Sequence, residues 1–327
     1  MIDGARMARP APIVLRPSPM RAAAGILPPL LFSFLLVYGR RDAARVLASD
    51  LVASPSTGCE CGRFDAELAR ARAAYASRQQ DVEVPLTPVM HLRYRARVDE
   101  TYARATCLAG CESVPELDRN RVRVLLAESG FKEASLGAGE RRNRLGAIVP
   151  AMERCLEIEP TNTGCLMWHA ASRGVLARGS LNPFNIRLPV QLIDEFHRAR
   201  GGKPPGLDAD GAATRGEAAM LLKVPRYAGG DPSAGRTLIE EAATTPGFAC
   251  RLSNRLVVAE ALGRTGDLPG THRELRAIVD GGLPACGEER YENAISLEKA
   301  ARCLARLEVA PTTDPGWNDD CRRDIRQ

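Results

Sequence analysis

Hydrophobic residues recur every three or four positions along most of the chain, which is the period of an α-helix that buries one face. In the stretch 63–78, for example, Phe64, Leu68 and Tyr75 follow this spacing without an interrupting proline or glycine. No sustained alternation of apolar and polar residues is bounded by a hairpin dipeptide, so we predict no β-strands. The pattern predicts an all-α chain with helices at 63–78, 91–110, 117–129, 143–158, 164–175, 190–199, 212–222, 232–243, 251–263, 270–279 and 291–308.

Helices of this length, joined by short polar turns, form either a single bundle or a solenoid of helical hairpins. Three of the predicted helices end alike, because a small or apolar residue is followed four or five positions later by Pro160, Pro246 or Pro311. Gly-Asp pairs at 230–231 and 266–267 each precede the second helix of a predicted hairpin. This punctuation is typical of tetratricopeptide-like repeats, and we therefore predict a helical-hairpin solenoid of that kind.

The N-terminal region contains an uncharged run of seventeen residues at 22–38, which resembles the hydrophobic core of a secretory signal peptide. Pro28 and Pro29 lie inside this run and disfavour a stable membrane-spanning helix, because each removes a helical hydrogen bond. We expect the run to direct export, and the nearest small-residue cleavage sites end at Ala48 and at Ala53. An uncleaved N-terminal anchor, a later start codon and a buried core segment remain alternatives.

These features divide the chain into four parts. We expect a leader with a signal or anchor segment at 1–48, a linker at 49–62, a tetratricopeptide-like helical domain at 63–310 and a C-terminal tail at 311–327. The leader predicts that the protein is located in the periplasm or elsewhere in the cell envelope.

The ten cysteines are an even number in a chain expected to reach an oxidising compartment, so disulfides are the leading interpretation. Cys155 and Cys165 flank the turn at Pro160 and would bridge a helical corner. Cys250 and Cys286 are expected at the same end of a later hairpin, which makes them a second candidate pair.

A metal site is the alternative for four other cysteines. Cys59 and Cys61 form a CxC pair, and Cys107 and Cys111 form a CxxxC pair on one face of a predicted helix. Neither pair has the CxxC spacing of structural zinc sites, so we expect no bound metal; a metal or redox module built from these cysteines remains a third hypothesis for function.

The charge distribution argues against a nucleic-acid partner. The formal net charge is +5, but residues 1–40 hold five arginines and one aspartate, which leaves 40 basic and 39 acidic groups in the remainder. The rest of the chain is thus nearly neutral and has no broad positive potential that would attract phosphate groups.

The composition also favours packed helices. Aromatic residues make up 5% of the sequence, so the core must come from alanine, leucine and valine.

The sequence also lacks the common catalytic signatures. It contains no GxSxG elbow, HExxH motif, GxxxxGK[ST] phosphate loop or GxGxxG fingerprint. The four histidines are widely separated, and the acidic neighbours of His197 indicate a solvated helix surface. We therefore expect no enzymatic activity and no cofactor.

The segments 155–179, 188–199 and 207–247 together resemble one family, the T-component group of TRAP transporters. The most telling stretch is 224–231, with the sequence VPRYAGGD, in which a proline and a short loop are followed by Gly-Asp before an amphipathic helix. Proteins of this group are tetratricopeptide-like and extracytoplasmic. The resemblance thus implies an exported helical protein that works beside a tripartite solute transporter, without catalysis of its own.

Within this resemblance, Trp168 matches the family's aromatic residue after the turn at Pro160. The family's later turn is matched by Pro225, Gly229, Gly230, Asp231 and Pro246. We expect these turn residues to be mostly structural, with Asp231 capping the helix that follows.

Four residues are candidates for binding a small organic ligand. Trp168 and Tyr227 offer large apolar surfaces with a polar tip, and Arg215 and Arg226 offer bidentate hydrogen bonds to a carboxylate. The alternative interpretation places Trp168 in the core and the arginines on a solvated helix face.

We thus expect an exported helical-repeat protein that acts as a ligand-binding or docking helper of a tripartite transporter, with the transporter's solute-binding protein as its partner. The alternative is a scaffold for other proteins of the cell envelope without a small-molecule ligand. Self-association into a homo-oligomer is compatible with either function.

Overall fold

The computed structural model describes residues 60–136, 141–177, 187–201, 211–244, 247–284, 289–312, 315–317 and 321. Every described residue belongs to one compact unit, Ala48–Gln327. The expected leader at 1–48 and most of the expected linker lie outside the described residues. Within the described part, no helix is both long enough and apolar enough to cross a membrane.

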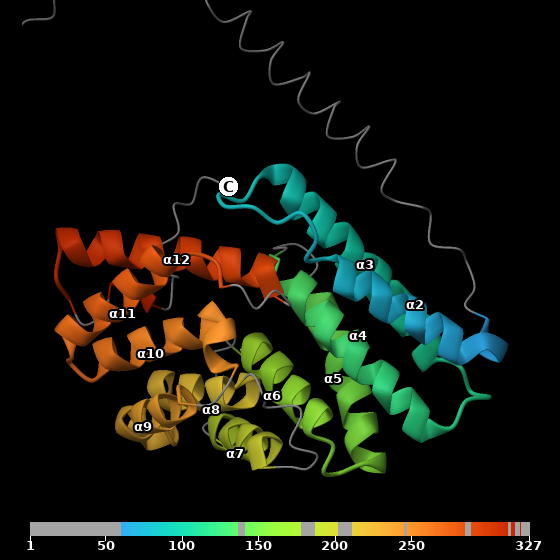
Figure 1. Cartoon of the computed structure of the whole chain (residues 1–327). Helices are drawn as coiled ribbons and strands as arrows, with labels where there is room; N and C mark the ends of the chain where they lie inside the picture. Colours follow the sequence, from blue (N-terminus) through green and yellow to red (C-terminus); the bar gives the residue numbers. More distant parts are fainter. Residues whose placement is uncertain are drawn as a thin grey trace, which may run out of the picture. The chain divides into compact units, whose positions relative to one another are not determined.

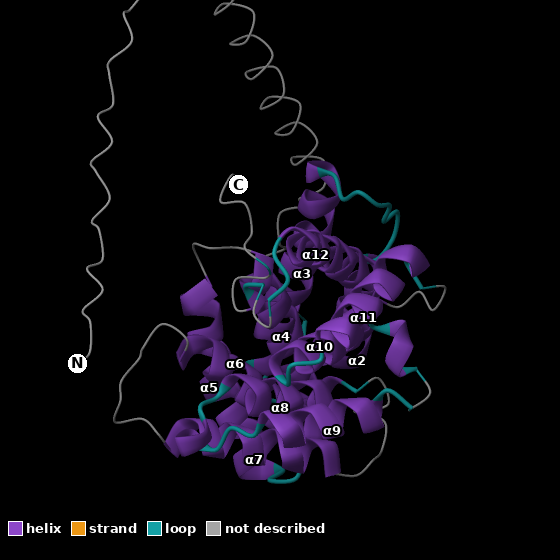
Figure 2. Ribbon diagram, turned by 90° about the vertical axis from the view of Figure 1, so that its left-hand side faces the viewer, coloured by secondary structure: helices purple, strands orange, loops and turns teal. Residues whose placement is uncertain are grey.

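All regular structure in the described residues is helical, which confirms the predicted all-α class (Figures 1 and 2). The α-helices are α2 (Phe64–Ser77), α3 (Pro88–Ala109), α4 (Glu116–Leu136), α5 (Arg141–Ile158), α6 (Thr163–Ala177), α7 (Arg187–Gly201), α8 (Ala212–Lys223), α9 (Pro232–Ala242), α10 (Leu252–Arg264), α11 (Leu268–Gly281) and α12 (Arg290–Val309). The described residues also form three short 3₁₀ helices, namely η1 (Cys61–Arg63), η2 (Arg226–Ala228) and η3 (Phe248–Cys250).

Each α-helix packs against the next one along the chain, from α2 through to α12, as expected for a helical-hairpin solenoid. The even-numbered helices also contact one another in order, α2 with α4, α4 with α6, α6 with α8, α8 with α10 and α10 with α12. The even-numbered helices therefore form one continuous layer, and each odd-numbered helix packs against its even-numbered neighbours in sequence. This even-numbered layer supplies most of the polar side chains described in the next subsection.

Asp231 has the capping role that the sequence predicts. The Asp231 carboxylate accepts hydrogen bonds from the backbone N–H groups of Ser233 (3.0 Å) and Ala234 (3.1 Å) at the start of α9. Asp267 caps α11 in the same way, accepting from the N–H of Gly270 at 2.8 Å. Gly230 must be a glycine, because a Cβ there would overlap the carbonyl oxygen of Val224.

Helix boundaries differ from the predicted ones where local rules allow a longer helix. Helix α3 begins at Pro88, because a proline in the first turn sacrifices no intrahelical hydrogen bond, and the side chain of Thr87 caps it. Helix α4 continues to Leu136, well beyond the predicted end at 129.

Two residues of the expected C-terminal tail pack against the helical domain. Trp317 and Cys321, which follow α12, are buried against α10, α11 and α12.

Histidine–carboxylate pairs tie three successive helices together. His169 on α6 lies 2.9 Å from Glu195 on α7, and His197 on α7 lies 3.1 Å from Glu217 on α8. Arg173 and Arg200 contact the same two carboxylates. Both histidines thus act as links between neighbouring helices.

Three disulfides lie within the described residues, namely Cys61–Cys111, Cys155–Cys165 and Cys303–Cys321. The predicted Cys155–Cys165 bridge is confirmed, and it joins the end of α5 to the start of α6. Cys107 and Cys250 are also disulfide-bonded, whereas Cys59 and Cys286 lie outside the described residues. The metal hypothesis is wrong for Cys61 and Cys111, because their sulfur atoms are bonded to each other.

Replacing both Cys155 and Cys165 by alanine should lower the free energy of unfolding by about 3 kcal/mol, because the bridge restricts a short loop in the unfolded chain. Urea denaturation of the variant and the parent, both kept oxidised, measures the difference. An unchanged unfolding free energy would show that this bridge does not stabilise the fold.

Candidate functional site

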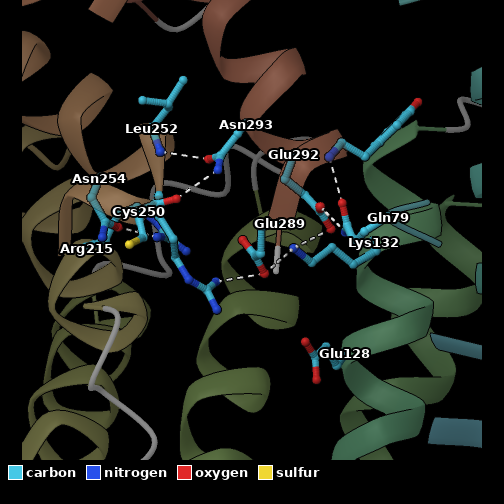
Figure 3. Close-up of polar contacts among 12 residues, drawn as sticks. Gln79, Glu128, Lys132, Arg215, Cys250, Leu252, Asn254, Glu289, Glu292 and Asn293 are labelled. Atoms are coloured by element: carbon cyan, nitrogen blue, oxygen red, sulfur yellow. Dashed lines mark hydrogen bonds and ion pairs between the residues drawn. The ribbon is translucent and has the colours of Figure 1, made fainter. Parts of the chain in front are cut away.

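Two carboxylates at the start of α12 contact side chains from the N-terminal helices of the solenoid. Glu289 immediately precedes α12, and Glu292 lies in its first turn. Around them lie side chains from the residues just after α2, from α3 and α4, and from the residue before α10. Figure 3 shows Gln79 and Lys132 beside Glu289 and Glu292. We call this group the Glu292 cluster; it consists of Arg78, Gln79, Tyr94, Lys132, Arg251, Glu289 and Glu292.

Direct ion pairs and hydrogen bonds connect the members of the Glu292 cluster. The Lys132 Nζ lies 3.1 Å from Glu292 and 3.5 Å from Glu289. Arg78 approaches Glu292 at 3.4 Å, and Arg251 contacts Glu289 at 3.0 Å. The Tyr94 hydroxyl donates to Glu292 at 2.8 Å, and Gln79 donates to the same carboxylate.

These neighbours keep Glu292 ionised although it is largely withdrawn from water. Burial by itself raises the pKa of a carboxyl, but the positive charges of Lys132 and Arg78, with hydrogen bonds from Tyr94 and Gln79, lower the pKa of Glu292 to about 2. Burial and the charge of Glu292 together raise the pKa of Tyr94 well above its ordinary value. Tyr94 therefore stays protonated and remains a donor to Glu292.

A second polar group connects the same end of α12 to the start of α10. The Asn293 amide accepts a hydrogen bond from the N–H of Leu252 and donates one to the carbonyl of Cys250, both at 2.8 Å (Figure 3). Asn254 on α10 donates to the carbonyl of Phe248 at 3.0 Å and accepts from the guanidinium of Arg215 on α8. Arg215 is thereby oriented by a fully buried amide.

Beside Arg215, helices α8, α10 and α12 enclose a partly open cleft of about 190 Å³, which we call the α8–α10–α12 cleft. Among its described lining residues, three carry a positive charge, namely Arg215, Lys223 and Lys299, whereas Glu260 carries a negative one. Lys223 lies 3.2 Å from Glu260, which also accepts from Arg264 at 2.8 Å. The lining thus has an excess of positive charge.

Another part of the cleft lining is apolar. Leu256 and Val257 on α10 contribute aliphatic surface, and Trp317 contributes an indole ring. The Cys303–Cys321 disulfide also borders the cleft. A site that combines cationic and apolar surfaces is suited to a small organic anion rather than to a metal ion. The described residues include no group of three or more side chains that could hold a metal.

The structure separates the four ligand-binding candidates that the sequence suggests. Arg215 lines the cleft. Trp168 packs beside Phe131, with ring centroids 5.2 Å apart, against the core formed by α2 to α6. Tyr227 is 79% exposed, and Arg226 beside it in η2 is also exposed, so of these four described residues Arg215 alone belongs to the cleft.

Sequence reasoning missed Lys223, Lys299 and Trp317 as cleft residues. The two lysines carry a weak signal, because they are among only four lysines in a chain whose other basic residues are arginines. Trp317 carries none, since it follows the last predicted helix.

No protein-family model and no curated protein matches this chain. The resemblance to the transporter family therefore depends on the segments 155–179, 188–199 and 207–247 alone, and the site itself has to indicate the function.

The ionised state of Glu292 should make stability depend on pH in the acid range. Because its pKa is lower in the folded protein than the ordinary 4.5, the stabilisation is complete above about pH 5 and is lost as the pH falls towards 2. We expect a loss of roughly 3 kcal/mol from this group over that range. Urea denaturation at several pH values measures it.

Glu292→Gln should remove this part of the pH dependence, besides lowering stability at neutral pH by breaking a buried ion pair. Glu157→Gln is the matched control, because the Glu157 side chain is 64% exposed. If Glu292→Gln kept the acid dependence of the parent protein, Glu292 would not be the group responsible.

Proposed function

We propose that this protein is an extracytoplasmic helical-hairpin solenoid that binds a small carboxylate-bearing solute in the α8–α10–α12 cleft, as a helper of a tripartite solute transporter. The observation that carries the proposal is the gathering of Arg215, Lys223 and Lys299 around one small cleft with a single described carboxylate, Glu260, in its lining.

Arg215 is the residue best suited to hold a carboxylate. A guanidinium presents its N–H donors in a planar fork that matches the two oxygens of a carboxylate. The contact with Asn254 fixes the direction of this fork before any ligand arrives, which reduces the entropy lost on binding. Lys223 and Lys299 add positive charge nearby, and the pairing of Lys223 with Glu260 keeps part of that charge balanced when the cleft holds no ligand.

The size of the cleft limits the solute. Pockets for drug-sized ligands measure roughly 300 to 1,000 Å³, whereas this cleft measures about 190 Å³. A carboxylic acid of a few carbon atoms is therefore the expected ligand. The proposal includes no chemical reaction on it.

The disulfides support a location outside the cytoplasm. Disulfides persist in oxidising compartments and are rare where thiols are kept reduced, and three of them lie within the described residues. They agree with export directed by the N-terminal apolar run. The resemblance to the T-component group adds the transporter, because the segments that carry it span α6 to α9 and include Arg215. In this proposal the partner is the solute-binding protein of the transporter.

One observation favours the alternative function, a scaffold for another envelope protein. Val190 at the start of α7 is 52% exposed and Tyr227 in η2 is 79% exposed, and Gly229 beside η2 lies close to Val190, since a Cβ there would be 3.1 Å from its side chain. Exposed apolar and aromatic side chains are common at protein–protein contacts. A docking role for this surface is compatible with solute binding in the cleft.

Removing the charge of Arg215 should weaken carboxylate binding. We expect Arg215→Met to raise the dissociation constant for butyrate or succinate tenfold to a hundredfold, because a hydrogen bond to a charged group contributes about 1.5 to 3 kcal/mol. Isothermal titration calorimetry measures this, with butyramide as the uncharged comparison ligand.

Arg226→Met is the matched control, because Arg226 is exposed on η2 and does not line the cleft. It should leave the affinity unchanged. The proposal fails if the parent protein binds neither acid at millimolar concentration, or if both arginine variants bind like the parent.

A further inference from the structure

Trp317 lies beyond the end of α12, yet it forms part of the cleft wall. Its side chain is well packed, since the residue is only 7% exposed. It belongs to the same core cluster as Leu252 and Ala259 on α10 and Leu304 on α12. A tryptophan near the chain end is thus held against the even-numbered helices as firmly as a core residue.

Two features hold Trp317 in this place. The Cys303–Cys321 disulfide bonds the C-terminal segment to α12, four residues after the tryptophan. On α10, Gly263 leaves room for the indole, because a Cβ at that position would lie only 3.2 Å from Nε1 and Cζ2 of Trp317. The covalent bond and the missing side chain together fix the indole beside the cleft.

The cleft therefore presents two kinds of surface to one small ligand. The first is a cationic surface that extends along α8, because Arg215 and Lys223 lie eight residues apart, which is roughly 12 Å along the helix axis. Leu256, Val257 and Trp317 supply the apolar surface. A short polar anion such as acetate would contact the cationic surface and leave the apolar wall wetted by water.

We propose that the cleft selects amphipathic carboxylates, whose anionic end binds at Arg215 and whose aliphatic or aromatic body packs against Trp317, with the Cys303–Cys321 disulfide as the device that positions this wall. The inference depends on the proposed carboxylate binding and adds the specificity determinant. Trp317 acts here by apolar contact with the ligand, and the disulfide acts through Trp317.

The first test is a series of straight-chain acids, acetate, butyrate and hexanoate, titrated by calorimetry. Burying one methylene group strengthens binding by about fourfold, so affinity should rise steeply from acetate to hexanoate.

Fluorescence gives a second test. Because the chain contains two tryptophans, Trp168→Phe leaves Trp317 as the sole indole fluorophore. Its emission should shift on hexanoate binding and change little with acetate.

Variants of the wall then identify its source. Trp317→Leu and Trp317→Ala should flatten the dependence on chain length while acetate affinity, set by Arg215, stays within about twofold. Trp317→Leu retains apolar volume and guards against the case in which the alanine variant fails to fold. Replacing Cys303 and Cys321 by alanine should flatten the dependence too, whereas the double alanine variant of Cys155 and Cys165 should preserve it.

The outcomes separate this inference from the proposed function. If acids bind but their affinity does not change with chain length, or if the Trp317 and Cys303/Cys321 variants keep the full dependence, the inference is wrong and carboxylate binding stands. If no acid of the series binds the parent protein, both are wrong.

Discussion

A carboxylate withdrawn from water is stable only when cations and hydrogen-bond donors surround it, and this condition fixes where α12 can lie. Glu292 meets the condition only with Arg78 from the end of α2, Tyr94 from α3 and Lys132 from α4 around it. These partners lie about 160 to 210 residues away in sequence. Among the described helices, the cluster therefore joins α12 to α3, α4 and the end of α2, a contact that neighbour-to-neighbour hairpin packing does not provide.

The position of α12 in turn determines the cleft. Glu292, Ser296, Lys299 and Cys303 follow one another at spacings of three or four residues, so they share one face of the helix. The last three line the cleft. Any rotation of α12 that separated Glu292 from Lys132 would also turn Lys299 away from the cleft. Asn293 adds a second restraint, because its amide is bonded to the backbone on both sides of Arg251. The Glu292 cluster and the cleft are thus two ends of the same helix face.

The fold could be predicted from sequence because its determinants are local. The apolar period sets each helix, and Asp231 and Asp267 end the preceding turn by accepting from the first N–H groups of the next helix. The Cys155–Cys165 bridge was predictable for the same reason, since only one turn separates the two residues. The long-range contacts of Glu292 were not predictable. Its neighbours in sequence give no sign of which distant lysine or arginine it meets, in a chain with 45 basic residues.

The same distinction explains the site. Arg215 could be singled out because a guanidinium on a predicted helix suits a carboxylate, but nothing local indicates that Asn254 orients it. Trp317 is held at the cleft wall by a disulfide between residues eighteen positions apart and by the close approach that the missing side chain of Gly263 allows. Neither feature has a periodic signature. A cleft lining assembled from one helix face, one amide contact and one covalent bond becomes visible only in the folded structure, where Trp317 joins Leu256 and Val257 of α10 although it lies beyond α12.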